Sequence, residues 1–140
     1  MTDLSDSEFI RAFEGCTLPG ERFHHREHIR LAWLYLRAEA PDAAERRMEE
    51  GIRRYAAHLG ASQKYHHTIT LFWMRAVASA LGEGPRHPSF DAFMAAHLEL
   101  LDKALVERHF SPPLLESAAA RSGWVEPDRL PLERRATIGA

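Results

Sequence analysis

Apolar residues recur at three- and four-residue intervals along most of this 140-residue chain, and no stretch shows the apolar and polar alternation of a strand. Glycine and proline interrupt the helical pattern at short intervals. Hydrophobic residues make up 45% of the chain and charged residues 27%, a balance typical of one folded domain. The sequence therefore predicts an all-α fold: a compact single-domain helical bundle of residues 1–140, with about six to seven helices and an irregular C-terminal tail from about residue 123.

Capping signals predict where the helices begin and end. Ser5 and Glu8 have the spacing of a capping box, and Ser111 precedes proline at a first helical position. The expected helices cover about 6–15, 24–39, 42–59, 63–81, a short segment after Ser89, 98–109 and 111–121. The helix over 63–81 is apolar on nearly every side, so we expect it to be the most buried. Trp124 and Val125 should tie the first half of the tail to the body, while 134–140 should fray.

The charge and hydropathy patterns argue against a nucleic acid or a membrane as a binding partner. Eighteen basic and 20 acidic residues are mixed along the chain, so no basic stripe is available to neutralise nucleic-acid phosphates. The apolar stretch from Ile69 to Leu81 contains Arg75 and is too short to cross a membrane. One cysteine, Cys16, and no signal-peptide pattern favour a reducing cytoplasm. We expect a cytoplasmic protein that binds a small-molecule substrate or ligand, with no nucleic acid or membrane partner and with a homo-oligomer left open.

Histidines are the side chains that most strongly suggest chemistry. Five of the nine lie in two short clusters, at 24–28 and 66–67, and each cluster opens an expected helix. His25 and His28 are three residues apart, which places their side chains about 60° apart on one helix face, with Cβ atoms about 5 to 6 Å apart. Both imidazoles can therefore reach one ion. Ala32 and Tyr35 follow on nearly the same face, so the pair should point inward.

The second cluster supplies a third imidazole by the same reasoning. Thr70 and Trp73 fall within about 40° and 20° of the direction of His66, which places His66 on the buried face. Three histidines with an open coordination position are typical of a catalytic metal site. We predict that His25, His28 and His66 bind a divalent transition metal, namely zinc, iron, nickel or copper, which activates water or substrate.

Other residues have a lesser or alternative role. Tyr35, Thr70 and Trp73 are expected to line a substrate pocket or else to fill the core, and the small Ala32 leaves room for a ligand. Glu21, Glu27 and Glu99 are candidates for a completing carboxylate, and none has convincing spacing. The sequence disfavours a di-iron carboxylate bundle for the same reason. The remaining histidines are assigned to helix starts, rims, helix ends and loops: His24, His58, His67, His87, His97 and His109.

Two alternatives to a metalloenzyme stay open. In the first, the chain is a non-catalytic module that holds a small molecule or haem against the inward polar face. In the second, the histidines form a buried hydrogen-bonding network and the exposed helices form a protein interface.

The order of these residues also resembles a known pattern. The matching residues are Phe23-x-His25-x-x-His28-x-x-x-Ala32-Trp33-x-Tyr35-Leu36, then Tyr65-His66-x-Thr68-x-Thr70, then Arg108-x-Phe110-Ser111-Pro112, and finally Pro127-Asp128. This pattern is similar to that of an uncharacterised family of small all-helical bacterial proteins, and it implies helical structure and a role for His25, His28 and His66. The three histidines are also similar in architecture, but not in spacing, to the metal site of DinB-like proteins, some of which are thiol-dependent transferases or isomerases.

Overall fold

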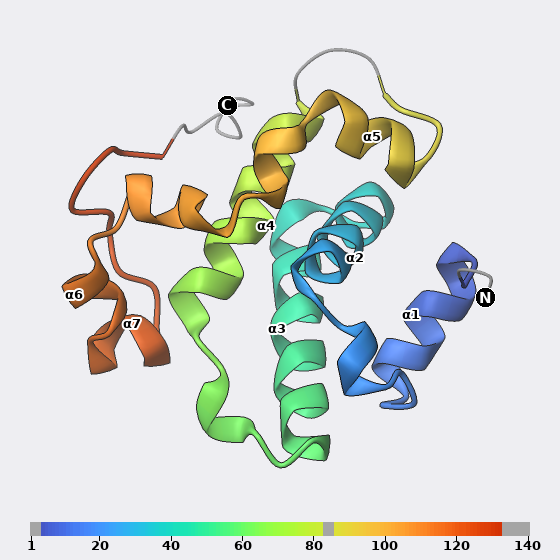
Figure 1. The fold of residues 1–140 in the computed structure, drawn as a ribbon, viewed down its shortest axis with the longest axis horizontal. Helices are drawn as coiled ribbons and strands as arrows, with labels where there is room; N and C mark the ends of the chain where they lie inside the picture. The colour runs from blue at the N-terminus through green and yellow to red at the C-terminus, as the bar shows by residue number, and fades with distance from the viewer. Residues whose placement is uncertain (1–3, 83–85, 133–140) are drawn as a thin grey trace. The chain divides into compact units, whose positions relative to one another are not determined.

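The computed structural model describes residues 4–82 and 86–132, and these residues form helices joined by short links (Figure 1). No strand occurs in the described segments, so the predicted all-α class is confirmed. Within them, no helix has both the length and the apolar character that a membrane span requires. The predicted fraying of 134–140 falls outside the described residues.

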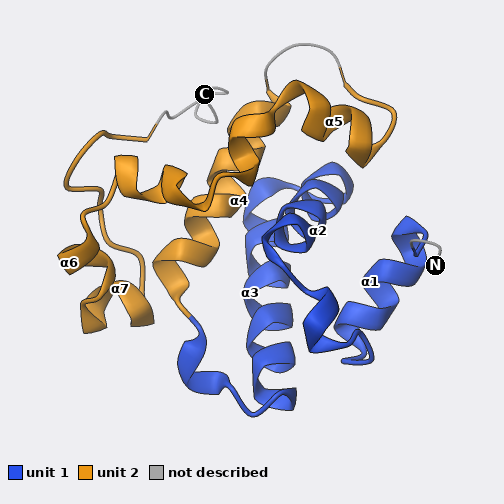
Figure 2. Cartoon of the chain, viewed as in Figure 1, with its two compact units in different colours: residues 1–65 blue, residues 66–140 orange. Residues whose placement is uncertain are grey.

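The chain divides into two compact units, residues 1–65 and 66–140 (Figure 2). Unit 1 contains α1 (Asp6–Glu14), η1 (Gly20–Arg22), α2 (His25–Ala38), α3 (Pro41–His58) and η2 (Ser62–Lys64), where η denotes a 3₁₀ helix. Unit 2 contains α4 (His67–Leu81), α5 (Phe90–Ala96), η3 (Leu98–Leu101), η4 (Lys103–Arg108), α6 (Pro112–Leu115) and α7 (Ala118–Ser122). The expectation that the whole chain forms a single domain stays a prediction.

Unit 1 packs α1 and α2 against α3 around an aromatic cluster. The ring centroids of Phe13 and Phe23 lie 5.2 Å apart, and Tyr55 of α3 lies 5.3 and 5.0 Å from these two rings. Gly51, one turn before Tyr55, leaves the space that the fully buried Phe13 ring fills. The Tyr55 hydroxyl donates a hydrogen bond to the Leu18 carbonyl at 2.7 Å, so the cluster is fixed to the backbone of the α1–α2 link.

The start of α1 agrees with the sequence prediction, and its end differs in detail. Ser5 Oγ accepts from the Glu8 N–H at 3.2 Å, and Glu8 Oε1 accepts from the Ser5 N–H at 2.9 Å, which completes the predicted capping box. The helix ends at Glu14, one residue before the expected end. The C-cap residue Gly15 has a φ of −89°, and the positive φ occurs at the next residue, Cys16 (φ 60°), although a glycine would adopt that conformation at lower cost.

Unit 2 is organised around α4, which contacts α7 and η4. Thr68 in the first turn of α4 is fully buried. Its hydroxyl donates to the Gly123 carbonyl at 2.7 Å and accepts from the Val125 N–H at 3.3 Å. Val125 thus ties the start of the tail to the body, as the sequence predicts.

Two segments that were expected to be single helices are each divided in two. The segment 98–109 forms η3 and η4 because the Asp102 carboxylate accepts from the Ala104 N–H at 3.0 Å and starts a new helix. The segment 111–121 forms α6 and α7 because Ser117 Oγ accepts from the Ala120 N–H at 3.2 Å. Both interruptions have the same cause, a short polar side chain that caps the backbone from inside the expected helix.

Candidate functional site

The first histidine cluster lies at the start of α2 in unit 1. His24 is the N-cap residue, and its backbone N–H donates to Glu27 Oε1 at 2.9 Å. Glu27, a candidate carboxylate ligand by sequence, therefore has a structural role at the helix start. His25 and His28 occupy the first turn of α2, as the sequence predicts, and both side chains are half-buried.

His28 has the environment of a neutral imidazole. Its ring packs against Phe23, with centroids 4.4 Å apart. Burial, and secondarily the neighbouring His25, lower the pKa of His28 to about 4 from a usual value of 6.5. Among the described residues of unit 1, neither ring nitrogen of His28 has a hydrogen-bond partner. An imidazole that stays neutral at pH 7 keeps a lone pair available for a ligand.

His66 belongs to unit 2 and has a different role from the one expected. It is the N-cap of α4, where Nδ1 accepts from the Ile69 N–H at 3.1 Å. The other ring nitrogen, Nε2, lies 2.6 Å from the Leu115 carbonyl oxygen, so it must carry the proton and donate. Burial lowers the pKa of His66, which agrees with a neutral ring. Because His66 precedes the first helical residue, the helical rotation used to place it inward does not apply.

A role for His66 in the predicted three-histidine site would require a change in its hydrogen bonds. Both nitrogens of His66 are already used within unit 2, so a metal would have to replace one of two hydrogen bonds. Over residues 4–82 and 86–132, no group of three or more His, Cys, Asp or Glu side chains is arranged to hold a metal ion. The assignment of His25, His28 and His66 as metal ligands stays a prediction.

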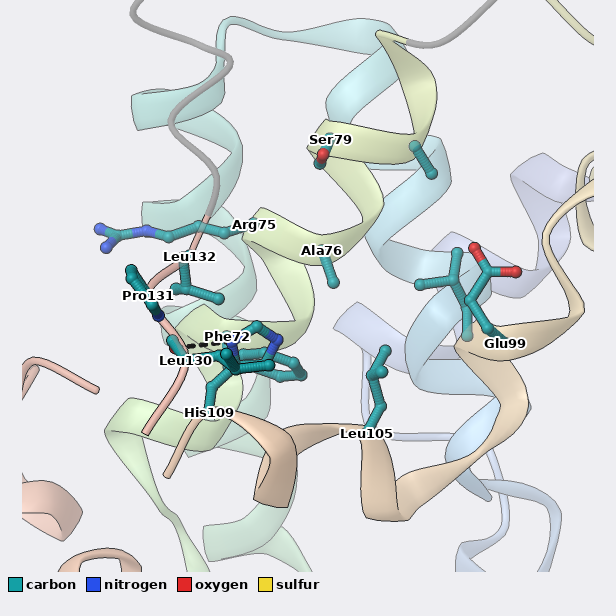
Figure 3. A pocket seen from close by; sticks show the side chains of 12 residues that line it. Phe72, Arg75, Ala76, Ser79, Glu99, Leu105, His109, Leu130, Pro131 and Leu132 are labelled. Atoms are coloured by element: carbon teal, nitrogen blue, oxygen red, sulfur yellow. Dashed lines mark hydrogen bonds between the residues drawn. The ribbon is translucent and has the colours of Figure 1, made fainter. Parts of the chain in front are cut away.

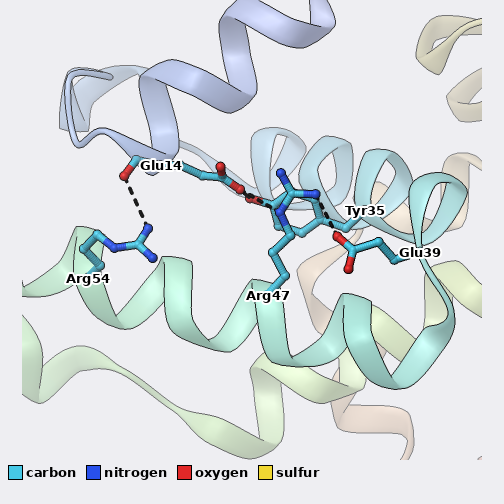
Figure 4. A network of polar contacts seen from close by, with 5 residues as sticks. All are labelled: Glu14, Tyr35, Glu39, Arg47 and Arg54. Atoms are coloured by element: carbon cyan, nitrogen blue, oxygen red, sulfur yellow. Dashed lines mark hydrogen bonds and ion pairs between the residues drawn. The ribbon is translucent and has the colours of Figure 1, made fainter.

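Tyr35, expected to bind substrate, takes part in a polar network of unit 1 (Figure 4). Its side chain is fully buried, and its hydroxyl donates to Glu14 Oε2 at 2.6 Å. Arg47 Nε donates to the same oxygen at 2.8 Å, and Arg47 Nη1 donates to Glu39 Oε2 at 2.8 Å. Burial and the hydrogen bond to Glu14 raise the pKa of Tyr35. The Tyr35 hydroxyl therefore links α2 to α1, and the Arg47 guanidinium connects α3 to the same carboxylate of α1.

The other two residues expected to bind substrate lie on α4. Thr70 donates from Oγ1 to the His66 carbonyl at 2.8 Å, a bond within its own helix. Trp73 is buried and packs edge-on against Phe72, with ring centroids 4.9 Å apart. A ligand-binding role for Tyr35, Thr70 and Trp73 stays a prediction.

A cavity of about 360 Å³ lies elsewhere in unit 2 (Figure 3). It is bounded by α4, η3, η4 and the segment 130–132. Its lining residues are Phe72, Arg75, Ala76, Ser79, Ala80, Glu99, Leu100, Leu105, His109, Leu130, Pro131 and Leu132. Most of these side chains are apolar, and few polar groups accompany them, which is the usual character of a small-molecule site.

His109 supplies an imidazole to the lining of this cavity. Its Nδ1 lies 2.8 Å from the Leu130 carbonyl oxygen, and its ring centroid is 5.5 Å from that of Phe72. Figure 3 shows the hydrogen bond on the Leu130 side of the ring, while the rest of the ring is directed toward Leu105. The sequence suggested only a helix-end role for His109, because its contact with residue 130 depends on tertiary structure.

Segment 129–132, which we call the strap, lies beside the end of η4, and its residues 130–132 form one wall of the cavity. Its backbone N–H groups donate to η4 and its end, from Arg129 to the His109 carbonyl at 2.9 Å and from Leu130 to the Arg108 carbonyl at 3.2 Å. The Arg129 guanidinium adds a bond to the Glu107 carbonyl at 2.8 Å. These bonds hold the strap against the histidine that faces the cavity.

Asp128, the residue before the strap, belongs to the sequence pattern described above. Both oxygens of the Asp128 carboxylate accept from Ser111, from the backbone N–H at 2.8 Å and from Oγ at 2.6 Å. Hydrogen bonds from Ser111 accordingly lower the pKa of Asp128. Ser111-Pro112 and Pro127-Asp128 were two separate pieces of the sequence pattern, and the structure joins them next to His109.

No family model, no curated protein and no solved structure matches this chain. The resemblance to an uncharacterised helical family therefore stays a prediction.

Proposed function

We propose that unit 2 binds a small, mainly apolar molecule in the cavity beside His109. The observation that carries this proposal is the combination of about 360 Å³ of mostly apolar space with an imidazole held in a fixed orientation. Pockets for small organic molecules have volumes of this order and position a few polar groups in an apolar wall. This function is of the same class as the non-catalytic binding module that the sequence left open, but at a different place, because Tyr35, Thr70 and Trp73 do not line this cavity.

Filling the cavity tests the proposal. Ala76 lines it and is half-buried, so Ala76→Leu adds volume inside the cavity with little disturbance of the core. We expect p-xylene to bind the wild-type protein saturably, as measured by amide shifts in NMR spectra, and to bind Ala76→Leu at least about tenfold more weakly. Ala57→Leu, at an exposed position of α3 in unit 1, is the matched control and should bind like the wild type. Equal binding to Ala76→Leu and the wild type would contradict the proposal.

We propose as a second candidate that His25 and His28, with His66 as the third ligand, hold a divalent transition metal such as zinc, iron, nickel or copper that activates water or substrate. The neutral, half-buried imidazole of His28, one turn after His25, supports this proposal. His66 would have to give up its bond to Leu115 or to Ile69. The geometry therefore supports a pair of ligands more directly than three.

Metal content of tag-free protein tests this second candidate. The wild type should carry stoichiometric metal, His28→Ala should lose it, and the exposed His58→Ala should keep it as the matched control. His66→Ala then separates a three-ligand site from a pair. Metal retained at full stoichiometry in His28→Ala would exclude the site. An absorbance spectrum checks the haem alternative, since a bound haem gives a Soret band.

A further inference from the structure

We propose that the molecule bound in the unit 2 cavity carries a hydroxyl or amine group that donates a hydrogen bond to Nε2 of His109. This inference rests on the proposed binding function and deepens it by naming the chemical class of the ligand. The class is a small aromatic or branched aliphatic molecule with one O–H or N–H donor, for example a phenol or an arylamine.

The strap determines which nitrogen of His109 is available. A backbone carbonyl oxygen can only accept, so the 2.8 Å contact between Nδ1 and the Leu130 oxygen requires a proton on Nδ1. In the neutral ring the lone pair then lies on Nε2. Figure 3 shows that the part of the ring opposite the Leu130 contact is directed toward Leu105, another lining residue. His109 therefore presents an acceptor to the cavity.

The other polar groups of the lining favour a donor over an anion. Arg75 contributes its side-chain stem, but its guanidinium lies 4.3 Å over the ring centroid of Trp124, and Figure 3 shows it extending away from Glu99. Glu99 also lines the cavity, but its side chain is 60% exposed and its Oε2 lies 3.7 Å from His97 Nδ1, so its negative charge lies toward solvent. The Ser79 hydroxyl can donate or accept. The His109 acceptor and the adaptable Ser79 hydroxyl match a donor group on the ligand, and the nearby Glu99 charge disfavours a carboxylate ligand.

The apolar part of the lining sets the rest of the ligand. Phe72 and Leu100 are buried side chains, and Ala76 and Ala80 are small. The cavity of about 360 Å³ has room for a single substituted ring or a compact branched chain. An apolar body with one polar group therefore fits, whereas a polyhydroxylated or multiply charged molecule would leave polar groups without partners.

The test uses two probes of nearly equal shape, p-cresol and p-xylene, which differ only by a hydroxyl in place of a methyl group. We take the ratio of the affinities of p-cresol and p-xylene for the full chain. Because the two probes have nearly the same shape, the contribution of packing largely cancels in this ratio. The variant is His109→Asn, because the Asn Nδ2 can replace the ring Nδ1 as donor to the Leu130 carbonyl while no acceptor remains at the Nε2 position. His87→Asn, at a half-buried histidine outside the lining, is the matched control.

We expect the preference for p-cresol over p-xylene to fall about five- to tenfold in His109→Asn and to be unchanged in His87→Asn, as the loss of one hydrogen bond predicts. In histidine-labelled protein, the ¹⁵N resonance of His109 Nε2 should be that of an unprotonated nitrogen and should shift with p-cresol but not with p-xylene. An unchanged ratio in His109→Asn, with both probes bound, overturns this inference and leaves the proposed function intact. Binding of neither probe to the wild type overturns the proposed function itself. Tighter binding of p-toluate than of p-cresol also overturns the assignment of a donor.

Discussion

The Tyr35 hydroxyl and the Glu14 carboxylate are joined by a hydrogen bond of 2.6 Å between α2 and α1, and Arg47 shares the same carboxylate oxygen. The Arg47 guanidinium also lies 4.3 Å from the centroid of the Tyr35 ring. The buried Tyr35 side chain therefore helps to hold α1, α2 and α3 together.

Tyr35→Phe removes this hydroxyl and keeps the ring. We expect the free energy of unfolding to fall by about 1 to 2 kcal/mol, because the lost bond is to a charged acceptor while the packing and the Arg47–Glu14 pair remain. Urea unfolding measured by circular dichroism would give the difference. A change below about 0.3 kcal/mol would mean that water replaces the hydroxyl without loss.

His28 makes stability depend on pH. Its folded-state pKa of about 4 is below the usual 6.5, so between these values the unfolded chain binds more protons than the folded chain. The contribution of the neutral His28 ring to the free energy of unfolding is therefore fully present above pH 6.5. The free energy of unfolding falls as the pH drops toward 4, by on the order of 3 kcal/mol for a shift of this size.

Replacing His28 by leucine should remove this dependence. Over pH 6.5 to 4, the free energy of unfolding of His28→Leu should change less than that of the wild type, as measured by urea unfolding at several pH values. The exposed His58→Leu should follow the wild type. If His28→Leu and the wild type show the same slope, the His28 ring is solvated and its pKa is not depressed.

Gly51→Ala tests the close packing of α3. A Cβ at this position would lie 2.7 Å from Cε2 of Phe13, whose ring is fully buried between Phe23 and Tyr55. Alanine gains up to about 1 kcal/mol in helix propensity, while overpacking a rigid core costs about 1 to 3 kcal/mol. We expect a net loss of about 1 kcal/mol in the free energy of unfolding.

The matched control for this substitution is Gly20→Ala, where the new Cβ would lie 3.4 Å from Leu59 Cδ1, an ordinary contact. Thermal unfolding should show a lower Tm for Gly51→Ala and a Tm close to the wild-type value for Gly20→Ala. A raised Tm in Gly51→Ala would show that Phe13 moves freely and that helix propensity dominates.

Thr68→Val should loosen the tail of unit 2. Valine has nearly the same shape, but it leaves the Gly123 carbonyl and the Val125 N–H without the hydroxyl that pairs with both. We expect a loss of about 2 kcal/mol in the free energy of unfolding, since two buried backbone groups lose their partner. Hydrogen exchange of the Val125 amide should accelerate; protection equal to that in the wild type would contradict this role.

The sequence predicted the helices well where caps and breakers mark their ends. The capping box at Ser5 and the proline at the start of α3 illustrate this, because their effects are local. The divisions at Asp102 and Ser117 were missed because each side chain could equally have faced solvent from inside a longer helix. Only the surrounding structure selects the capping arrangement.

The candidate site was harder to predict. Helical rotation correctly placed His25 and His28 in one turn of α2, but it could not show that His66 lies just before α4 and uses both ring nitrogens in hydrogen bonds. His109 has no informative neighbour in sequence, and its partner is 21 residues away. Periodicity detects which residues share a helix face, whereas a cavity depends on segments that meet only after folding.

Because of the bond between His109 and the strap, the width of the cavity and the position of the proton on His109 can change independently. This bond uses the main-chain oxygen of Leu130, and every amino acid supplies that oxygen, while the Leu130 side chain lines the cavity. Substitution at position 130 can therefore alter the width of the cavity and its choice of ligand without moving the proton on His109. Selectivity at this site can evolve one residue at a time while the acceptor stays constant.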